Sequence, residues 1–143
     1  MLAPTSVHAQ GVFVVTEPWV RPASAAGSTR AFMELSSSEG ATLIDVRCAA
    51  AASVSLMNGQ GRPVVPIALP LPAGATVLLA PARFQLALGR LTRPLRLGER
   101  VPLTLVIRNA DGTTQEIAVD AEVRLRSPTD DHRHPHQHPA PGA

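Results

Sequence analysis

Residues 101–119 carry the sequence VPLTLVIRNADGTTQEIAV, which has the clearest strand pattern in the chain. Apolar and polar residues alternate over residues 101–109, which predicts a strand that is buried on one side. Asn109-Ala110-Asp111-Gly112 is a strong turn signal, and a second strand is predicted at 113–119. The stretch therefore predicts an antiparallel β-hairpin whose first strand turns four residues inward: Val101, Leu103, Leu105 and Ile107.

Shorter strands are predicted on the N-terminal side of this hairpin and just after it. Turn signals recur about every 8–12 residues, and no segment sustains a helical period. In the segment 30–35, Ala31, Met33 and Leu35 share one face. The segment 63–69 contains two prolines, which predicts an edge strand or an extended loop. The other predicted strands are 12–16, 41–48, 53–57, 76–80, 84–88 and 122–126. We therefore expect an all-β fold, an antiparallel sandwich or barrel.

Composition excludes several classes of function. The chain has 143 residues, enough for one domain, and its net charge is +2 with thirteen arginines and no lysine. The arginines are scattered, so nucleic-acid binding is not expected. No apolar run approaches the ~20 residues that span a bilayer, so no membrane span is expected.

The two ends differ from the middle of the chain. Val7-His8-Ala9 before Gln10 fits the small-residue rule for signal-peptidase cleavage, so we expect residues 1–11 to be a disordered remnant of an export signal. Residues 12–126 are the predicted β-sandwich domain. Residues 127–143 are rich in His, Pro and Asp, which predicts a disordered tail because little apolar surface is available to offset the ordering entropy.

The tail holds four of the five histidines, at every second position: His132, His134, His136 and His138. Imidazoles with the neighbouring carboxylates suit Cu(II), Zn(II) or Ni(II) better than Cu(I). The tail is therefore a predicted flexible metal collector, and the alternative is a solvated polar extension without function. A further alternative places His8 at the mature N-terminus, where its amine and ring would chelate Cu(II).

Four segments occur in an order that identifies a family resemblance. They are EPWVR at 17–21, AFM at 31–33, LPAGATV at 71–77 and LTRPLRLGERVPLTL at 91–105. Together they resemble the PCuAC family of periplasmic copper chaperones, over residues 12–120. The resemblance implies a cupredoxin-like Greek-key β-sandwich, export to the periplasm, and Cu(I) handling with cytochrome oxidase assembly proteins as partners.

The copper motif of that family is largely lost. The family has a His, a Met about ten residues later, and a His-x-Met about twenty residues after that; the soft ligands suit Cu(I). Here Met57 follows Val54-Ser55-Leu56 in place of the first His, the loop at 58–63 has no Met, and Gln85 and Ala87 replace the His-x-Met pair. Met57 alone can bind copper, or it packs at a strand end.

Other candidate side chains have simpler interpretations. Met33 alternates with Ala31 and Leu35, so core packing is expected rather than a second sulfur ligand. Cys48 is the single cysteine and is expected to be a small buried hydrophobe, with a Cu(I) ligand or reactive thiol as the alternative. Trp19 is expected in the core or at its rim.

Two hypotheses follow. The first is a periplasmic copper-binding, chaperone-like protein that holds copper mainly through the four tail histidines. The second is a degenerate scaffold or protein-interaction module without a specific metal site. An enzyme is not expected, because residues 12–126 contain no histidine and no paired carboxylates.

Overall fold

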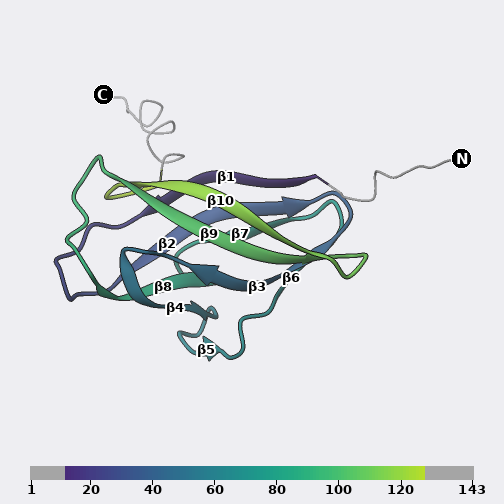
Figure 1. Ribbon diagram of the computed structural model, residues 1–143, viewed down its shortest axis with the longest axis horizontal. Coiled ribbons are helices and arrows are strands. Elements are labelled where there is room, and N and C mark those ends of the chain that lie inside the picture. The colour runs from purple at the N-terminus through teal and green to yellow at the C-terminus, as the bar shows by residue number, and fades with distance from the viewer. Residues whose placement is uncertain (1–11, 128–143) are drawn as a thin grey trace, which may run out of the picture.

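The computed structural model describes residues 12–127, and this part of the chain is built from strands, with no helix (Figure 1). Ten strands form a single sheet. In chain order they are β1 (Phe13–Val20), β2 (Thr29–Ser37), β3 (Ala41–Arg47), β4 (Ala51–Met57), β5 (Pro63–Val64), β6 (Leu69–Leu71), β7 (Thr76–Leu79), β8 (Gln85–Leu91), β9 (Arg100–Asn109) and β10 (Thr114–Val123).

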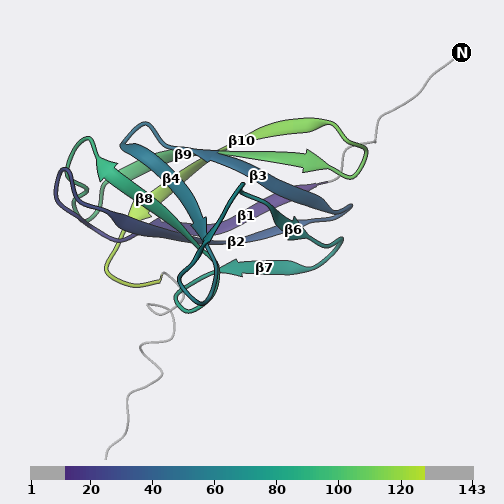
Figure 2. The same ribbon diagram turned by 90° about the horizontal axis from the view of Figure 1, so that it is seen from below.

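The sheet curls over on itself to make two layers. Its strand order is β5-β4-β8-β2-β1-β10-β9-β3-β6, and β7 pairs with β2 outside this path. Figure 2 shows β9, β10 and β3 in one layer and β1, β2 and β7 in the other. The predicted all-β sandwich is confirmed. One strand pair departs from the antiparallel rule, because β1 and β10 run parallel where Trp19 meets Glu122.

An aliphatic core fills the space between the layers. The four residues predicted on the inner face of β9 are buried, and so are Ala31, Met33 and Leu35 of β2. All seven belong to one hydrophobic cluster that also draws leucines from β4, β6, β7 and β8. Met33 is therefore a core residue, as its alternation predicted.

The β9–β10 hairpin forms at the predicted turn. Gly112 adopts a φ of 91°, a conformation that a side chain would strain. Asp111 Oδ1 accepts hydrogen bonds from the backbone N–H of Thr113 at 2.9 Å and from its hydroxyl at 2.6 Å. The Thr113 hydroxyl, and then its N–H, lowers the pKa of Asp111 by stabilising the carboxylate.

Strand β1 runs through Glu17-Pro18, where the sequence predicted a strand end. The pairing of β1 with β2 shifts register between Thr16 and Trp19, and Glu17 has a φ of 49°, so the chain forms a bulge. The bulge accommodates Pro18, which has no N–H to donate, and it reverses the alternation of side chains. Phe13 and Val15 pack on the core before the bulge, and Val20 does so after it.

The two strands predicted at 113–119 and 122–126 are one strand, β10. Asp120 stays in register opposite Pro102, so the ladder is not interrupted. The strand ends at Val123, and Leu125, which falls in the predicted strand 122–126, is 69% exposed. The Arg124 N–H donates to the Val20 carbonyl at 2.8 Å, and beyond that bond no strand within residues 12–127 pairs with Leu125.

The proline-rich segment lies at the edges of the sheet, as predicted. Pro63 belongs to β5 and Leu69 to β6, and these strands are the two ends of the strand order. The described residues contain no helix with the length and hydropathy that a bilayer crossing requires.

The core predicts a clear contrast between two leucines. Leu105→Ala should lower the free energy of unfolding by about 3 kcal/mol, because it leaves a cavity at a position with no exposed surface. Leu125→Ala removes the same atoms from an exposed site and should change the free energy of unfolding by less than about 0.5 kcal/mol. Urea denaturation of both variants measures the difference, and equal losses would contradict this core.

The cysteine is expected to react slowly in the folded protein. Cys48 is buried after β3, and burial raises the pKa of its thiol, because the thiolate is poorly solvated there. The thiolate is the reactive form, so alkylation by iodoacetamide near neutral pH should be at least about tenfold slower than for the urea-unfolded chain. Equal rates would show that Cys48 is accessible.

Candidate metal site

The residues that align with the family's copper motif lie on two neighbouring strands. Met57 of β4 is the register partner of Gln85 of β8, and Ser55 is the partner of Ala87. Leu56 and Leu86 between them are fully buried in the core. Because side chains alternate along a strand, the four site residues share the opposite, outer face of the β4–β8 pair. The fold thus brings together the positions that the sequence indicated.

The chemistry of these four side chains does not suit Cu(I). They supply one thioether, one amide, one hydroxyl and one methyl group, and all four residues are half-buried. The Ser55 hydroxyl donates a weak hydrogen bond to the Met57 Sδ at 3.9 Å. A single soft ligand cannot saturate Cu(I), and hydroxyl and amide oxygens prefer harder ions.

A positive charge adjoins this face as well. Arg30 of β2 is the register partner of Ala87 on the other side of β8, so its side chain leaves the sheet on the same face. A guanidinium is always charged, and at this place it disfavours a metal cation. The sequence alone did not reveal this neighbour, because Arg30 and Ala87 are far apart in the chain.

The loop after Met57 is closed on itself. The side-chain oxygen of Asn58 accepts hydrogen bonds from the N–H groups of Gln60 and Arg62, at 2.9 and 3.0 Å. The Asn58 N–H donates to the Arg62 carbonyl at 2.8 Å. These bonds hold a short turn that has no sulfur or imidazole to contribute.

The other sulfur atoms of residues 12–127 are in the core rather than near Met57. Met33 and Cys48 are both buried in the aliphatic cluster. Among residues 12–127, no three His, Cys, Asp or Glu side chains are grouped closely enough to hold a metal ion. The predicted tail ligands His132, His134, His136 and His138 lie outside the described residues, as does His8.

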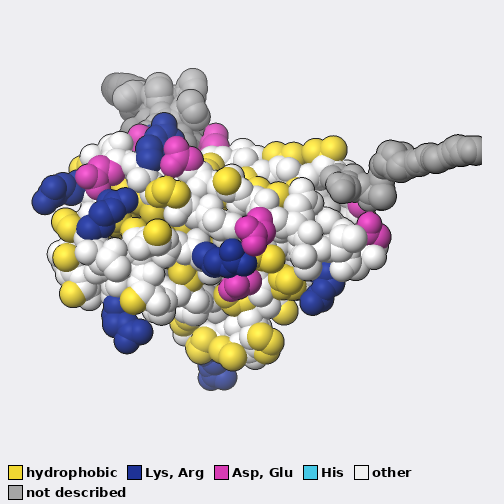
Figure 3. Space-filling view, in the orientation of Figure 1, with side chains coloured by type: hydrophobic (Ala, Val, Ile, Leu, Met, Phe, Trp, Pro, Cys, Tyr) yellow, Lys and Arg dark blue, Asp and Glu magenta, His cyan; other side chains and the backbone are white. Residues whose placement is uncertain are grey.

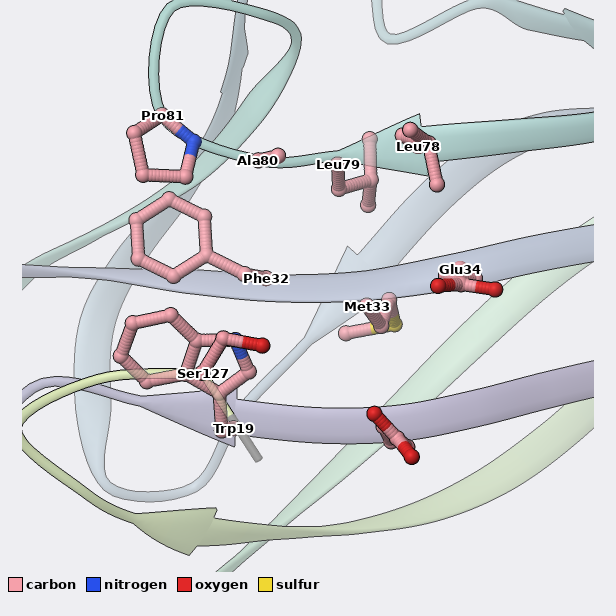
Figure 4. Close-up of a pocket in the computed structure, with 10 residues that line it drawn as sticks. Trp19, Phe32, Met33, Glu34, Leu78, Leu79, Ala80, Pro81 and Ser127 are labelled. Carbon is pink, nitrogen blue, oxygen red and sulfur yellow. The ribbon is translucent and has the colours of Figure 1, made fainter. Parts of the chain in front are cut away.

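One hollow of about 260 Å³ lies on the outer side of β1, β2 and β7, and its floor is aromatic (Figure 4). The rings of Trp19 and Phe32 are 4.7 Å apart between centroids, and the Arg21 guanidinium lies 5.9 and 5.2 Å from them. Trp19 is buried, as expected, and it packs against Phe32 on the outer side of the sheet. Pro81 covers the other side of Phe32 in Figure 4.

Sequence reasoning did not find this hollow. Two half-buried carboxylates, Glu17 and Glu34, line it together with Leu78 and Ser127, the last described residue. The sequence feature that points to it is Glu17-Pro18, because the bulge formed there turns Trp19 outward. The hollow has no soft ligand besides the buried Met33, and the Arg21 guanidinium already lies over the aromatic rings, so it does not suit Cu(I).

Sequence comparison places the chain among known proteins. The profile of the family described as "Putative lipoprotein LpqE-like" matches residues 13–121. A "Putative lipoprotein" of Leifsonia xyli subsp. xyli is 32% identical over 113 residues, which are 73% of this chain and 66% of that protein. The match therefore spans slightly less than two thirds of the relative's length.

Solved structures have the same fold. A copper-bound PCuAC domain from PmoF2 superposes with a TM-score of 0.68 at 24% identity, over 83% of this chain and 97% of that domain. The Cu(I) form of DR1885 from Deinococcus radiodurans gives a TM-score of 0.59 at 30% identity, over 82% of each chain. The chain therefore belongs to the LpqE-like family, which is related to the PCuAC domains, and the predicted resemblance is confirmed.

Proposed function

We propose that this chain is an exported, chaperone-like copper-binding protein that holds copper mainly through His132, His134, His136 and His138 of its tail. The relatives support the copper part, because a PCuAC domain and DR1885 were each solved with copper. The lipoprotein names of the matched family support export, and the periplasm is the compartment we propose.

One observation carries the assignment to the tail. The fold retains the two strands of the family's site, but Met57, Gln85, Ser55 and Ala87 supply a single soft ligand beside the Arg30 charge. In the chain as a whole, the only dense set of nitrogen ligands is the tail. Imidazole with carboxylate favours Cu(II) over Cu(I), with Zn(II) or Ni(II) as competing ions. Delivery to cytochrome oxidase assembly proteins belongs to the same proposal.

A second function is favoured by the same replacements. A family scaffold that has lost its Cu(I) ligands is suited to act as a protein-interaction module without a specific metal. The two functions differ in one measurable property, the copper affinity of the intact chain.

The first test changes the tail in the full-length protein. Replacing all four tail histidines by Asn should weaken Cu(II) binding by at least about a hundredfold, since four imidazole ligands are lost together. Calorimetric titration measures the affinity, and Met57→Leu serves as the matched control with little expected effect. In the unaltered chain, binding should fall as the pH drops below about 6.5, because protonated imidazole cannot bind a metal.

The outcomes separate the hypotheses. If the variant without the four tail histidines keeps its copper affinity, the tail is not the site. If Met57→Leu loses copper affinity, the site lies on the β4–β8 face. Weak binding by the unaltered chain, no tighter than micromolar, would favour the interaction module.

The second test restores the family's ligands. Gln85→His with Ala87→Met places an imidazole opposite Met57 and a thioether beside it, on one face. This variant should gain Cu(I) affinity by at least about tenfold, and adding Arg30→Gln should increase it further by removing the adjacent charge. Competition with a Cu(I) chelator measures the gain.

A matched control introduces the same His-x-Met pair on a strand that does not adjoin Met57. Thr114→His with Glu116→Met creates a His-x-Met on the exposed face of β10. If that control gains as much affinity as the β8 variant, the register with Met57 does not matter. If neither gains, the short loop after Met57 prevents the site from forming.

A further inference from the structure

Two leucines protrude at one end of the sandwich, side by side. Leu97 is 56% exposed and Leu125 is 69% exposed, and both line one shallow hollow of about 250 Å³ with Glu122, Arg124 and Arg126. Leu97 is at the tip of the loop between β8 and β9, next to Gly98, whose φ is 87°. The Gly98 N–H donates to the Val123 carbonyl at 3.0 Å, and the Val123 N–H donates to the Glu99 carbonyl at 2.9 Å. These bonds hold the loop against the end of β10.

Arginines surround the two leucines. The same loop carries Arg93 and Arg96, and Arg124 and Arg126 follow β10. Arg100 is the register partner of Glu122, so it shares the face on which Glu122 lines the hollow. Figure 3 shows dark-blue side chains gathered with magenta ones at this end of the molecule, where Figure 1 places the β8–β9 loop. We call these seven residues, with Glu99 and Glu122 in addition, the Leu–Arg surface.

The acidic residues of this surface are engaged within it. Glu99 Oε1 accepts from the Arg96 N–H at 2.9 Å and from Arg93 Nη1 at 3.4 Å. Glu122 pairs with Arg124 at 3.2 Å. Arg96 and Arg100 are exposed, and within residues 12–127 neither takes part in an ion pair. Five arginines against two glutamates give the surface a charge of +3, in a chain whose total is +2.

We infer that the Leu–Arg surface docks the protein onto an anionic lipid membrane. Guanidinium groups bind lipid phosphates through paired hydrogen bonds, and the surface charge attracts anionic headgroups. Leu97 on the β8–β9 loop and Leu125 just after β10 can both enter the boundary between headgroups and acyl chains, where their burial is favourable. The positive charge and the two exposed leucines together match the interfacial region of an anionic bilayer, which is the partner we infer for this surface.

An acidic protein would use the surface differently. Exposed charge pairs contribute little at a protein contact, and a protein partner would need a pocket for each leucine. A membrane needs no preformed pocket, because the lipids deform around both leucines. The inference does not rest on copper binding, since the β4–β8 face is not part of this surface.

Flotation of the full chain with lipid vesicles tests the proposal. The protein should float with vesicles of equal parts phosphatidylglycerol and phosphatidylcholine, and stay behind with phosphatidylcholine alone. Leu97→Ser with Leu125→Ser should lower the vesicle partition coefficient by about tenfold. Arg96→Gln with Arg100→Gln should lower the partition coefficient by about twenty-fivefold, or about fivefold for each arginine.

Matched controls lie elsewhere on the molecule. Val65→Ser alters a residue that is 81% exposed, and Arg62→Gln alters an exposed arginine in the β4–β5 loop. Both should bind vesicles like the unaltered chain. The proposal is overturned if the controls lose as much binding as the surface variants, or if no vesicle binds the unaltered chain. It is also overturned if the leucine variant binds normally, because the surface would then recognise charge alone, as an acidic protein partner requires.

Discussion

The packing of aliphatic side chains between two curled layers is the interaction on which the other features depend. The chain has one Trp, three Phe and no Tyr, and leucine and valine are most of the buried hydrophobic residues. Residues from most of the strands meet in one cluster, which includes Leu35 of β2, Leu86 of β8 and Leu105 of β9. Because side chains alternate along a strand, each of these inward residues also determines which neighbours point out. The outer face is therefore a direct consequence of the core.

That relation explains how a family site can lose its ligands while the fold persists. Leu56 and Leu86 are buried, and they keep Ser55, Met57, Gln85 and Ala87 aligned on the outside whatever those four residues are. The outward residues contribute little to the core, so their replacement is tolerated by the fold. Metal binding, by contrast, depends on the donor atoms themselves. The scaffold and the site are thus separable, and the proposed transfer of copper binding to the tail uses this separation.

Much of the fold was predictable because period-two alternation is a local signal. The strand at 101–109, the Asp111-Gly112 turn, the inward side of Ala31, Met33 and Leu35, and the edge position of the proline segment were all expected and are observed. The exceptions are places where a neighbouring strand decides. The bulge at Glu17-Pro18 carries β1 onward because the ladder with β2 resumes at Trp19. Leu125 is exposed because β10 ends at Val123, and the spacing of apolar residues does not show where the ladder stops.

For the candidate site, residue order was enough to predict the family resemblance, the replacement of every family ligand with Met57 as the one soft side chain left, and the concentration of histidines in the tail. These are statements about residue types in order along the chain, and order is enough to make them. The tertiary structure decided what lies beside what: Met57 opposite Gln85, Arg30 adjoining the same face, and Leu97 next to Leu125. Such neighbours come from strands and loops distant in sequence, and the burial of the aliphatic core is what brings them together.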